Sequence, residues 1–177
     1  FKATNGIGAL IKWYDVGYKY VRHYDMRYSE WFGINESIRV TTIKPSGTVS
    51  LLAGATPGIH HPIGEYYIRR IRIQNDTPLL KILKNCGLFT EPDVSSDNTT
   101  VVEFPIHVGS NVPSEKDLSI WEQFELTAIT QQYWADNAVS VTIKVDPKKN
   151  TEKDIVSALD YYQYRLKGVS LLPEPEE

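Results

Sequence analysis

Four consecutive residues, Ser46, Gly47, Thr48 and Val49, could together bind an anion. They follow Pro45, which cannot donate a main-chain hydrogen bond and so ends the extended run before it. Ser46 suits a helix N-cap that accepts from the amide of Thr48 or Val49, and Gly47 has no Cβ to keep a ligand away. The amides of residues 47–49 would converge at the positive end of a helix dipole. The pattern predicts a site for an anion, most plausibly phosphate.

Two common phosphate-binding patterns are absent from the chain. Neither Gly-x4-Gly-Lys-Ser/Thr nor Gly-x-Gly-x-x-Gly occurs. Strand-turn-helix junctions with Ser and Gly also occur in α/β proteins that bind nothing there. From the pattern alone, a phosphate site and a purely structural turn are both open.

An extended run and a short helix should position this turn. Residues 38–44 are rich in β-branched side chains, which predicts a strand. Val49, Leu52 and Ala53 share one helical face, and Gly54 suits the C-terminal cap. The turn-rich loop 55–62 follows directly, so it could line the same pocket. His60 and His61 are adjacent and diverge in an extended chain, and we expect no metal site.

The strand predicted over residues 66–73 carries Arg69, Arg70 and Arg72. Alternation places Arg70 and Arg72 on one face and Arg69 on the other, so the three should not form one clamp. We expect them to pair with carboxylates on a partly solvated strand.

Two helices are predicted in the first half of the chain outside the turn region. Apolar residues spaced by three and four predict an amphipathic helix over 6–31, whose tyrosines we expect to pack in the core. Residues 77–87 begin with Thr-Pro and end with Gly, as a short helix does. The single cysteine, Cys86, lies at the end of that helix, where we expect a small buried side chain.

The second half of the chain continues the alternation of strands and helices. Strands are predicted over 99–106, 138–145 and 169–172, and helices over 114–134 and 151–167. Strands separated by helices indicate α/β architecture.

The totals exclude several classes of protein. The formal net charge of −3 over 177 residues argues against a general nucleic-acid binder, and no apolar run is long enough to cross a membrane. One cysteine allows no intrachain disulfide and fits a reducing cytoplasm. The chain begins without methionine, and we expect it to be a piece of a longer polypeptide.

The order of these motifs resembles adenosylcobalamin-dependent (class II) ribonucleotide reductase, in particular the monomeric ribonucleoside-triphosphate reductases. The likeness runs through residues 40–62, with Pro-Ser-Gly-Thr at 45–48, and continues through 66–73, 101–105, 134–143 and 166–173. It implies the C-terminal part of a ten-stranded α/β barrel, with residues 1–177 as a single partial domain. It also implies that Pro45, Ser46, Gly47, Thr48 and Val49 hold the substrate phosphates, and that Gly58 and His60 line the pocket.

The resemblance implies that the reaction itself is carried out elsewhere. Asn85-Cys86-Gly87 lacks the proline and glutamate of the family's radical cysteine motif, so no catalytic residue is expected in this chain. Leu171 and Leu172 stand where iron-dependent relatives hold a tyrosine pair, which favours the cobalamin class. The implied partners are a ribonucleoside triphosphate, the remainder of the reductase chain and a thioredoxin-type reductant. A diphosphate substrate, a stand-alone phosphate-binding module and a non-catalytic interaction domain are the alternatives.

Overall fold

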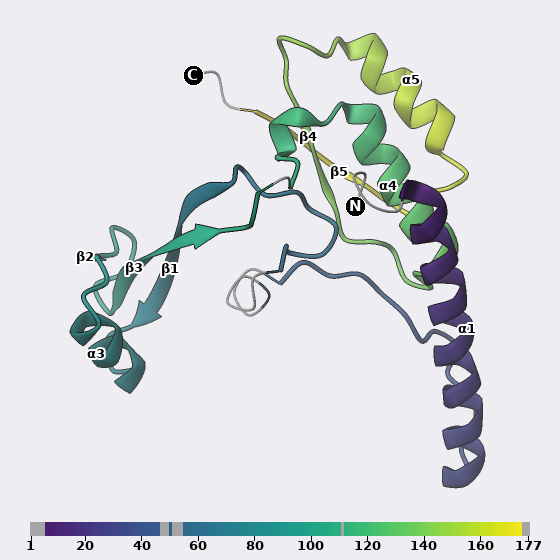
Figure 1. Cartoon of the computed structure of the whole chain (residues 1–177), viewed down its shortest axis with the longest axis horizontal. Coiled ribbons are helices and arrows are strands. Elements are labelled where there is room, and N and C mark those ends of the chain that lie inside the picture. The colour runs from purple at the N-terminus through teal and green to yellow at the C-terminus, as the bar shows by residue number, and fades with distance from the viewer. Residues whose placement is uncertain (1–5, 47–49, 51–54, 111, 175–177) are drawn as a thin grey trace.

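The computed structural model describes residues 6–46, 50, 55–110 and 112–174, and its architecture is mixed α/β (Figure 1). A long N-terminal helix lies on one side. A small antiparallel sheet with its own helix projects away from the part formed by two parallel strands and two helices. The α/β class agrees with the sequence. The ten-stranded barrel is not established, because the described strands form one sheet of three and one of two.

The N-terminal helix α1 spans Gly6–Phe32, as the apolar spacing predicts. It contacts the rest of the chain mainly on the side of Tyr14, whose ring centroid lies 6.0 Å from that of Trp134. The expectation of core packing is wrong for other aromatic side chains of the helix. Tyr20 is 62% exposed and its ring lies tilted beside that of Tyr24, which in turn lies beside the exposed Tyr28. Spacing identifies a face of a helix, but it does not show what covers that face.

The antiparallel sheet has the order β1-β3-β2, with β1 at Tyr66–Gln74, β2 at Thr90–Pro92 and β3 at Thr99–His107. Strand β2 is too short to give a period in the sequence, and it was not predicted. Helix α3 spans Pro78–Asn85 and joins β1 to β2. Cys86 caps the end of α3 and is exposed, so the expectation of a buried thiol is wrong.

Arg70 and Arg72, which share one face of β1, pair with acids as expected. Arg70 lies opposite Glu103 in the register, with 3.4 Å between Nε and Oε1, and also contacts Glu91. The Nε of Arg72 donates to Asp93 at 2.9 Å. These pairs hold β1, β2 and the chain after it together on one face.

The main core lies between the parallel strands and the two helices that cover them. Strands β4 (Thr142–Val145) and β5 (Ser170–Pro173) pair in parallel, and helices α4 (Ile120–Tyr133) and α5 (Glu152–Tyr162) pack on them. Phe124 of α4 is 1% exposed and stacks on Tyr162 of α5 with 5.4 Å between ring centroids. The core cluster is completed by the following residues: Ile120, Ala128, Ile143 and Ala158.

Several predicted boundaries were wrong, each for a local reason. Ser114 does start a capped turn, but that turn is the short 3-10 helix Glu115–Asp117, and it ends at Leu118 in extended conformation. Helix α4 begins only after a second capping box, in which Ser119 accepts from the amide of Glu122. Helix α5 begins at the predicted Thr151 cap but ends at Tyr162, and β4 begins at Thr142.

Among the described residues, no helix is long and apolar enough to cross a membrane.

Replacing Phe124 should destabilise the chain more than replacing any neighbouring aromatic residue. Phe124→Ala leaves a cavity in a closed cluster, and we expect it to lower the free energy of unfolding by about 3–5 kcal/mol. The control is Trp121→Ala, because Trp121 is adjacent but 40% exposed, and its loss should be less than half as large. Chemical denaturation followed by circular dichroism measures both values. Equal losses would show that the core is not centred on Phe124.

Candidate functional site

The described part of the candidate turn is Pro45 and Ser46. Gly47, Thr48 and Val49 lie outside the described residues, as do the predicted helical positions 51–54. The Oγ of Ser46 accepts from the amide of Ser50 at 3.2 Å, and the Ser50 hydroxyl donates to the Ser46 carbonyl at 2.6 Å. Ser50 is helical, so these two contacts join Ser46 to a helical residue four positions later.

The chain entering the turn is extended but does not form the strand predicted over residues 38–44. It lies beside residues 137–140, and two main-chain hydrogen bonds join the segments. The amide of Asn137 donates to Thr41 at 3.2 Å, and that of Ser140 donates to Ile43 at 3.1 Å. The two donors are three residues apart while the two acceptors are two apart. A regular ladder cannot continue through that mismatch.

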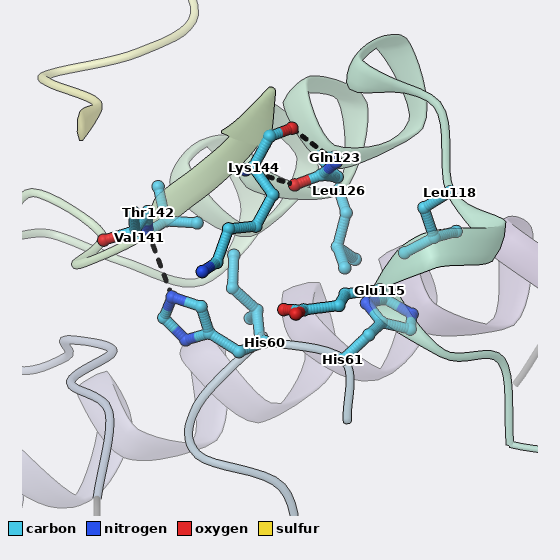
Figure 2. Close-up of a pocket in the computed structure, with 10 residues that line it drawn as sticks. His60, His61, Glu115, Leu118, Gln123, Leu126, Val141, Thr142 and Lys144 are labelled. Carbon is cyan, nitrogen blue, oxygen red and sulfur yellow. Dashed lines mark hydrogen bonds between the residues drawn. The ribbon is translucent and has the colours of Figure 1, made fainter. Parts of the chain in front are cut away.

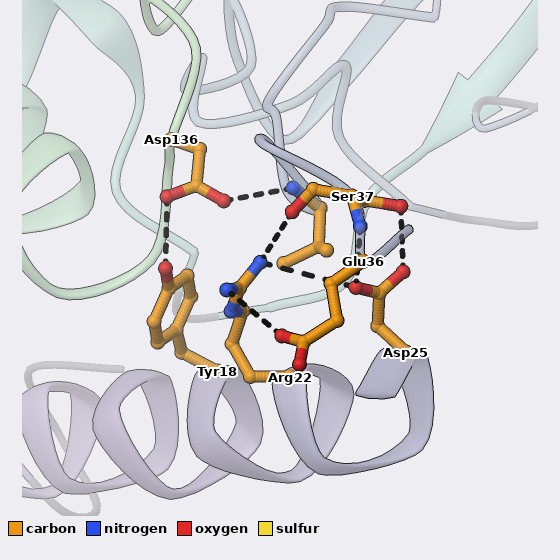
Figure 3. Close-up of polar contacts among 7 residues, drawn as sticks. Tyr18, Arg22, Asp25, Glu36, Ser37 and Asp136 are labelled. Carbon is orange, nitrogen blue, oxygen red and sulfur yellow. Dashed lines mark hydrogen bonds and ion pairs between the residues drawn. The ribbon is translucent and has the colours of Figure 1, made fainter. Parts of the chain in front are cut away.

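The carboxylate of Asp136 fastens this segment to helix α1 (Figure 3). Its Oδ2 accepts from the amide of Val40 at 2.8 Å, and its Oδ1 accepts from the hydroxyl of Tyr18 at 2.9 Å. The amide of Asp136 donates in turn to Oγ1 of Thr41 at 3.1 Å. One residue therefore joins helix α1, the entering segment and the end of helix α4.

These contacts change the acidity of both partners. Burial raises the pKa of Asp136, but the hydrogen bonds from Val40 and Tyr18 outweigh it, so the pKa lies below its usual value. The hydrogen bond to Asp136 raises the pKa of Tyr18. The carboxylate is therefore held ionised and serves as an anchor.

A second set of polar contacts holds the preceding residues on α1 (Figure 3). The guanidinium of Arg22 donates to the carbonyl of Ser37 at 2.6 Å and lies 3.7 Å from Glu36. The hydroxyl and amide of Ser37 both donate to Asp25, at 2.6 and 2.9 Å. The hydroxyl bond lowers the pKa of Asp25. Residues 36–41 are thus held at several points before the turn.

Gly58 packs against the entering segment, not into a cavity. Its φ is +63°, in the left-handed region that favours glycine. A Cβ at this position would lie 3.4 Å from Cγ2 of Ile43 and 3.5 Å from Cα of Pro45. The corner of the loop 55–60 therefore touches the first residue of the candidate turn.

His60 lines a small cavity together with residues that include Glu115 and Lys144 (Figure 2). The cavity measures about 30 Å³, which holds about one water and no nucleotide. Nε2 of His60 lies 3.1 Å from the amide nitrogen of Thr142, and Nδ1 lies 2.9 Å from the carbonyl oxygen of Pro57. The sequence indicated His60 as a candidate pocket residue. In the structure, both of its ring nitrogens contact main-chain groups.

Asp136 and Gln123 were given no role in the sequence analysis. Gln123 binds both main-chain polar groups of Lys144, accepting from its amide at 3.0 Å and donating to its carbonyl at 3.2 Å. A glutamine on a helix has no distinctive spacing. Asp136 follows the end of α4 in Trp-Ala-Asp-Asn, a position that indicates a cap or turn but not its distant partners.

The described residues hold the entrance of the candidate turn at several points. Extended chain, loop corner and helix start meet at Pro45 and Ser46. No group of three or more His, Cys, Asp or Glu that could hold a metal occurs in the described part of the chain. The described geometry fixes Pro45 and Ser46, which directly precede the amides of residues 47–49 that the sequence predicts to bind an anion.

The chain is similar to known proteins over nearly its whole length. A probable adenosylcobalamin-dependent ribonucleoside-triphosphate reductase from Dictyostelium discoideum is 51% identical over 169 residues, which cover 96% of this chain and 22% of that protein. The Euglena gracilis enzyme of the same name is 47% identical over 98% of this chain and 24% of its own length. The enzyme from Lactobacillus leichmannii is 48% identical over 92% of this chain.

A solved structure agrees with these relatives. The crystal structure of a B-12 dependent (class II) ribonucleotide reductase superposes with a TM-score of 0.81 at 46% identity, covering 96% of this chain and 24% of that one. No family model matches the chain.

Fold and sequence together make the chain a relative of class II ribonucleotide reductase. Within that class, its curated relatives are adenosylcobalamin-dependent ribonucleoside-triphosphate reductases, and it spans between a fifth and a quarter of their length.

Asp136→Asn should destabilise the chain in a pH-dependent way. The lowered pKa means that the stabilising contribution is present above the ordinary value of 3.8 and is lost as the pH falls through the folded value. We expect a loss of about 1–3 kcal/mol in the free energy of unfolding at neutral pH, and a smaller difference from wild type below about pH 4.

The control for this prediction is Asp15→Asn, which removes an exposed ion pair with Lys19. Its effect should be below about 1 kcal/mol. Urea denaturation at a series of pH values gives both curves. A difference for Asp136→Asn that stays constant down to about pH 2 would contradict the role of the carboxylate charge.

Proposed function

We propose that this chain is part of an adenosylcobalamin-dependent ribonucleoside-triphosphate reductase, and that its turn at residues 45–49 binds the phosphates of the substrate. The similarity to reductases over nearly the whole chain supports the first statement. The observation that supports the second is the convergence on Pro45 and Ser46 of the entering segment, the corner of the loop 55–60 and the helical Ser50.

The turn would act through its main chain. Amides of residues 47–49, at the positive end of a helical turn, would donate to phosphate oxygens, and Gly47 would let those oxygens approach. The hydroxyls of Ser46 and Thr48 stand beside them in the sequence. Ser46 already bonds to Ser50, so its role is to shape the turn as well as to contact the ligand.

The parent enzyme would reduce ribonucleotides at the 2′ carbon through a cysteine thiyl radical, and adenosylcobalamin would supply the radical when bound. The residues described in this chain do not fit that cofactor. The cavity that His60 lines holds about one water at 30 Å³, and Cys86 lies exposed at the end of α3. We therefore assign binding of the substrate to this region, and the radical chemistry to the rest of the protein.

The finer features belong to the same proposal. Residues 1–177 would form a single partial domain, the C-terminal part of a ten-stranded α/β barrel, with the remainder of the barrel as its partner. A triphosphate substrate follows from the names of the relatives. A thioredoxin-type reductant and a cytoplasmic location follow from the family resemblance and the single cysteine.

Gly47→Val in the full-length reductase should impair substrate binding. A side chain at position 47 would keep phosphate oxygens from the amides, and we expect KM for the ribonucleoside triphosphate to rise at least tenfold, about 1.4 kcal/mol. Ser46→Ala should raise KM by a smaller factor, because it removes one cap hydrogen bond. Steady-state kinetics measures both.

Gly168→Val is the matched control, because a Cβ there meets no atom within 4 Å. Its KM should stay within about twofold of wild type. Nucleotide titration of the isolated chain should give weak or absent binding, because the remainder of the pocket lies elsewhere. If Gly47→Val has unchanged kinetics, the turn does not bind the substrate.

A further inference from the structure

Helix α1 has two apolar sides, and the contacts within this chain cover mainly one of them. The covered side carries Tyr14, whose ring lies near Trp134, and Tyr18, whose hydroxyl donates to Asp136 (Figure 3). With 3.6 residues per turn, Tyr18 and Tyr20 leave the helix on nearly opposite sides. The second side carries a stripe of large apolar side chains, which we call the α1 stripe. It consists of Val16, Tyr20, Tyr24, Tyr28 and Trp31.

The aromatic side chains of the α1 stripe lie against one another and face solvent. Trp31 is 64% exposed and Tyr28 is 46% exposed. From Tyr20 through Tyr24 and Tyr28 to Trp31, successive ring centroids are 4.8, 5.8 and 5.3 Å apart. The hydroxyl of Tyr20 also donates to that of Tyr24 at 3.3 Å. The stripe is therefore one continuous surface and not a set of scattered side chains.

A continuous stripe of this kind marks an interaction surface. From Val16 to Trp31 it runs over about four turns of helix, or about 22 Å. Single exposed apolar side chains are ordinary on soluble proteins, whereas contiguous apolar patches mark sites of interaction. Tyrosine and tryptophan are enriched at such interfaces. Figure 1 shows the second half of α1 extending beyond helices α4 and α5.

The spacing of the stripe suits a second helix as its partner. Tyr20, Tyr24 and Tyr28 are four residues apart in succession. Side chains at this spacing form a ridge, and such ridges pack into the grooves of a facing helix.

Arg27 specifies the charge of the partner. Its guanidinium lies over the ring of Trp31, 4.9 Å from the ring centroid, and so within the stripe. None of the ion pairs formed within the described part of the chain includes Arg27. A charge that is covered without a counter-charge is costly. A partner that covers the stripe should therefore place a carboxylate beside Arg27.

The length of the relatives indicates where this partner comes from. The chain spans 22% and 24% of the length of two of them, so most of a full-length reductase lies outside it. A second copy of α1 has poor charge complementarity. Its two aspartates, Asp15 and Asp25, already bind Lys19 and Ser37.

We propose that the α1 stripe binds a helix from the remainder of the reductase chain, with an apolar face along the three tyrosines and a carboxylate beside Arg27. The inference rests on the proposed function, because it requires this chain to be part of a longer reductase. It does not involve the turn at residues 45–49. Helix α1 is then held on two sides, by Asp136 and the segment 36–41 on one and by the second helix on the other.

Photo-cross-linking of the full-length reductase tests this assignment. Tyr28 and Met26 form a matched pair, because both are 46% exposed in this chain but lie on nearly opposite sides of α1. Each is replaced in turn by p-benzoylphenylalanine, and the irradiated products are mapped by mass spectrometry. We expect the Tyr28 variant to form an intramolecular cross-link to a segment outside residues 1–177, and we expect this product to be lost in the Met26 variant.

Two further results test the chemistry of the partner. The same replacement at Tyr20 should link to the same segment, about eight residues from the first product, because two helices that run side by side rise equally per residue. An Asp or Glu should lie within about one turn of the residue linked to Tyr28. The proposal is overturned by no product at Tyr28, by equal products at Tyr28 and Met26, by a cross-link to a second copy, or by a linked segment without an acid.

The activity of the full-length protein separates this proposal from the function on which it rests. If the protein reduces ribonucleoside triphosphates but Tyr28 forms no intramolecular cross-link, the reductase assignment stands and the helix-binding surface is wrong. If the protein reduces none, the reductase assignment fails even where the cross-link forms.

Discussion

The structure around the candidate site depends on satisfying the main chain of residues 135–145 with few strand partners. Side chains supply most of the missing hydrogen bonds. The carboxamide of Gln131 donates to Ala135 at 2.7 Å and accepts from Val139 at 3.1 Å. Further along the segment, the side chains of His60 and Gln123 bind the amides of Thr142 and Lys144. Because an unpaired buried amide or carbonyl costs about 1–3 kcal/mol, these side chains fix where the segment can lie.

That requirement connects the core to the turn. Helix α4 carries both glutamines and also buries Phe124 in the core. Because the core fixes helix α4, it also sets the position of β4. Strand β4 then holds His60, and Asp136 holds Val40 against helix α1. The entrance of the turn is thereby fixed by residues nearly a hundred positions away in the sequence. The proposed site at residues 45–49 would need this support, because main-chain amides have no long side chains that could adjust to a ligand.

The sequence predicted the helices and strands that have a clear hydrophobic period. It also predicted the ion pairs of β1, because alternation places Arg70 and Arg72 on the same face. It was misleading where tertiary contacts override local preference. Residues 38–44 have strand composition, but their neighbour offers mismatched spacing, and Tyr28 of α1 has core spacing but is exposed. Of the candidate residues, Pro45 and Ser46 lie at the meeting point of the anchored segments. Gly58 lies beside Ile43 and Pro45, and His60 contacts Thr142 of β4. A one-dimensional pattern cannot reveal these contacts, because the partners lie elsewhere in the sequence.

The capped edge of β4 also limits how this sheet can grow. A new strand laid along Thr142 and Lys144 would have to displace an imidazole and a carboxamide that already saturate those amides. A further strand can therefore extend this sheet only by pairing with β5. The side chains that saturate the amides of β4 also protect it against edge-to-edge aggregation.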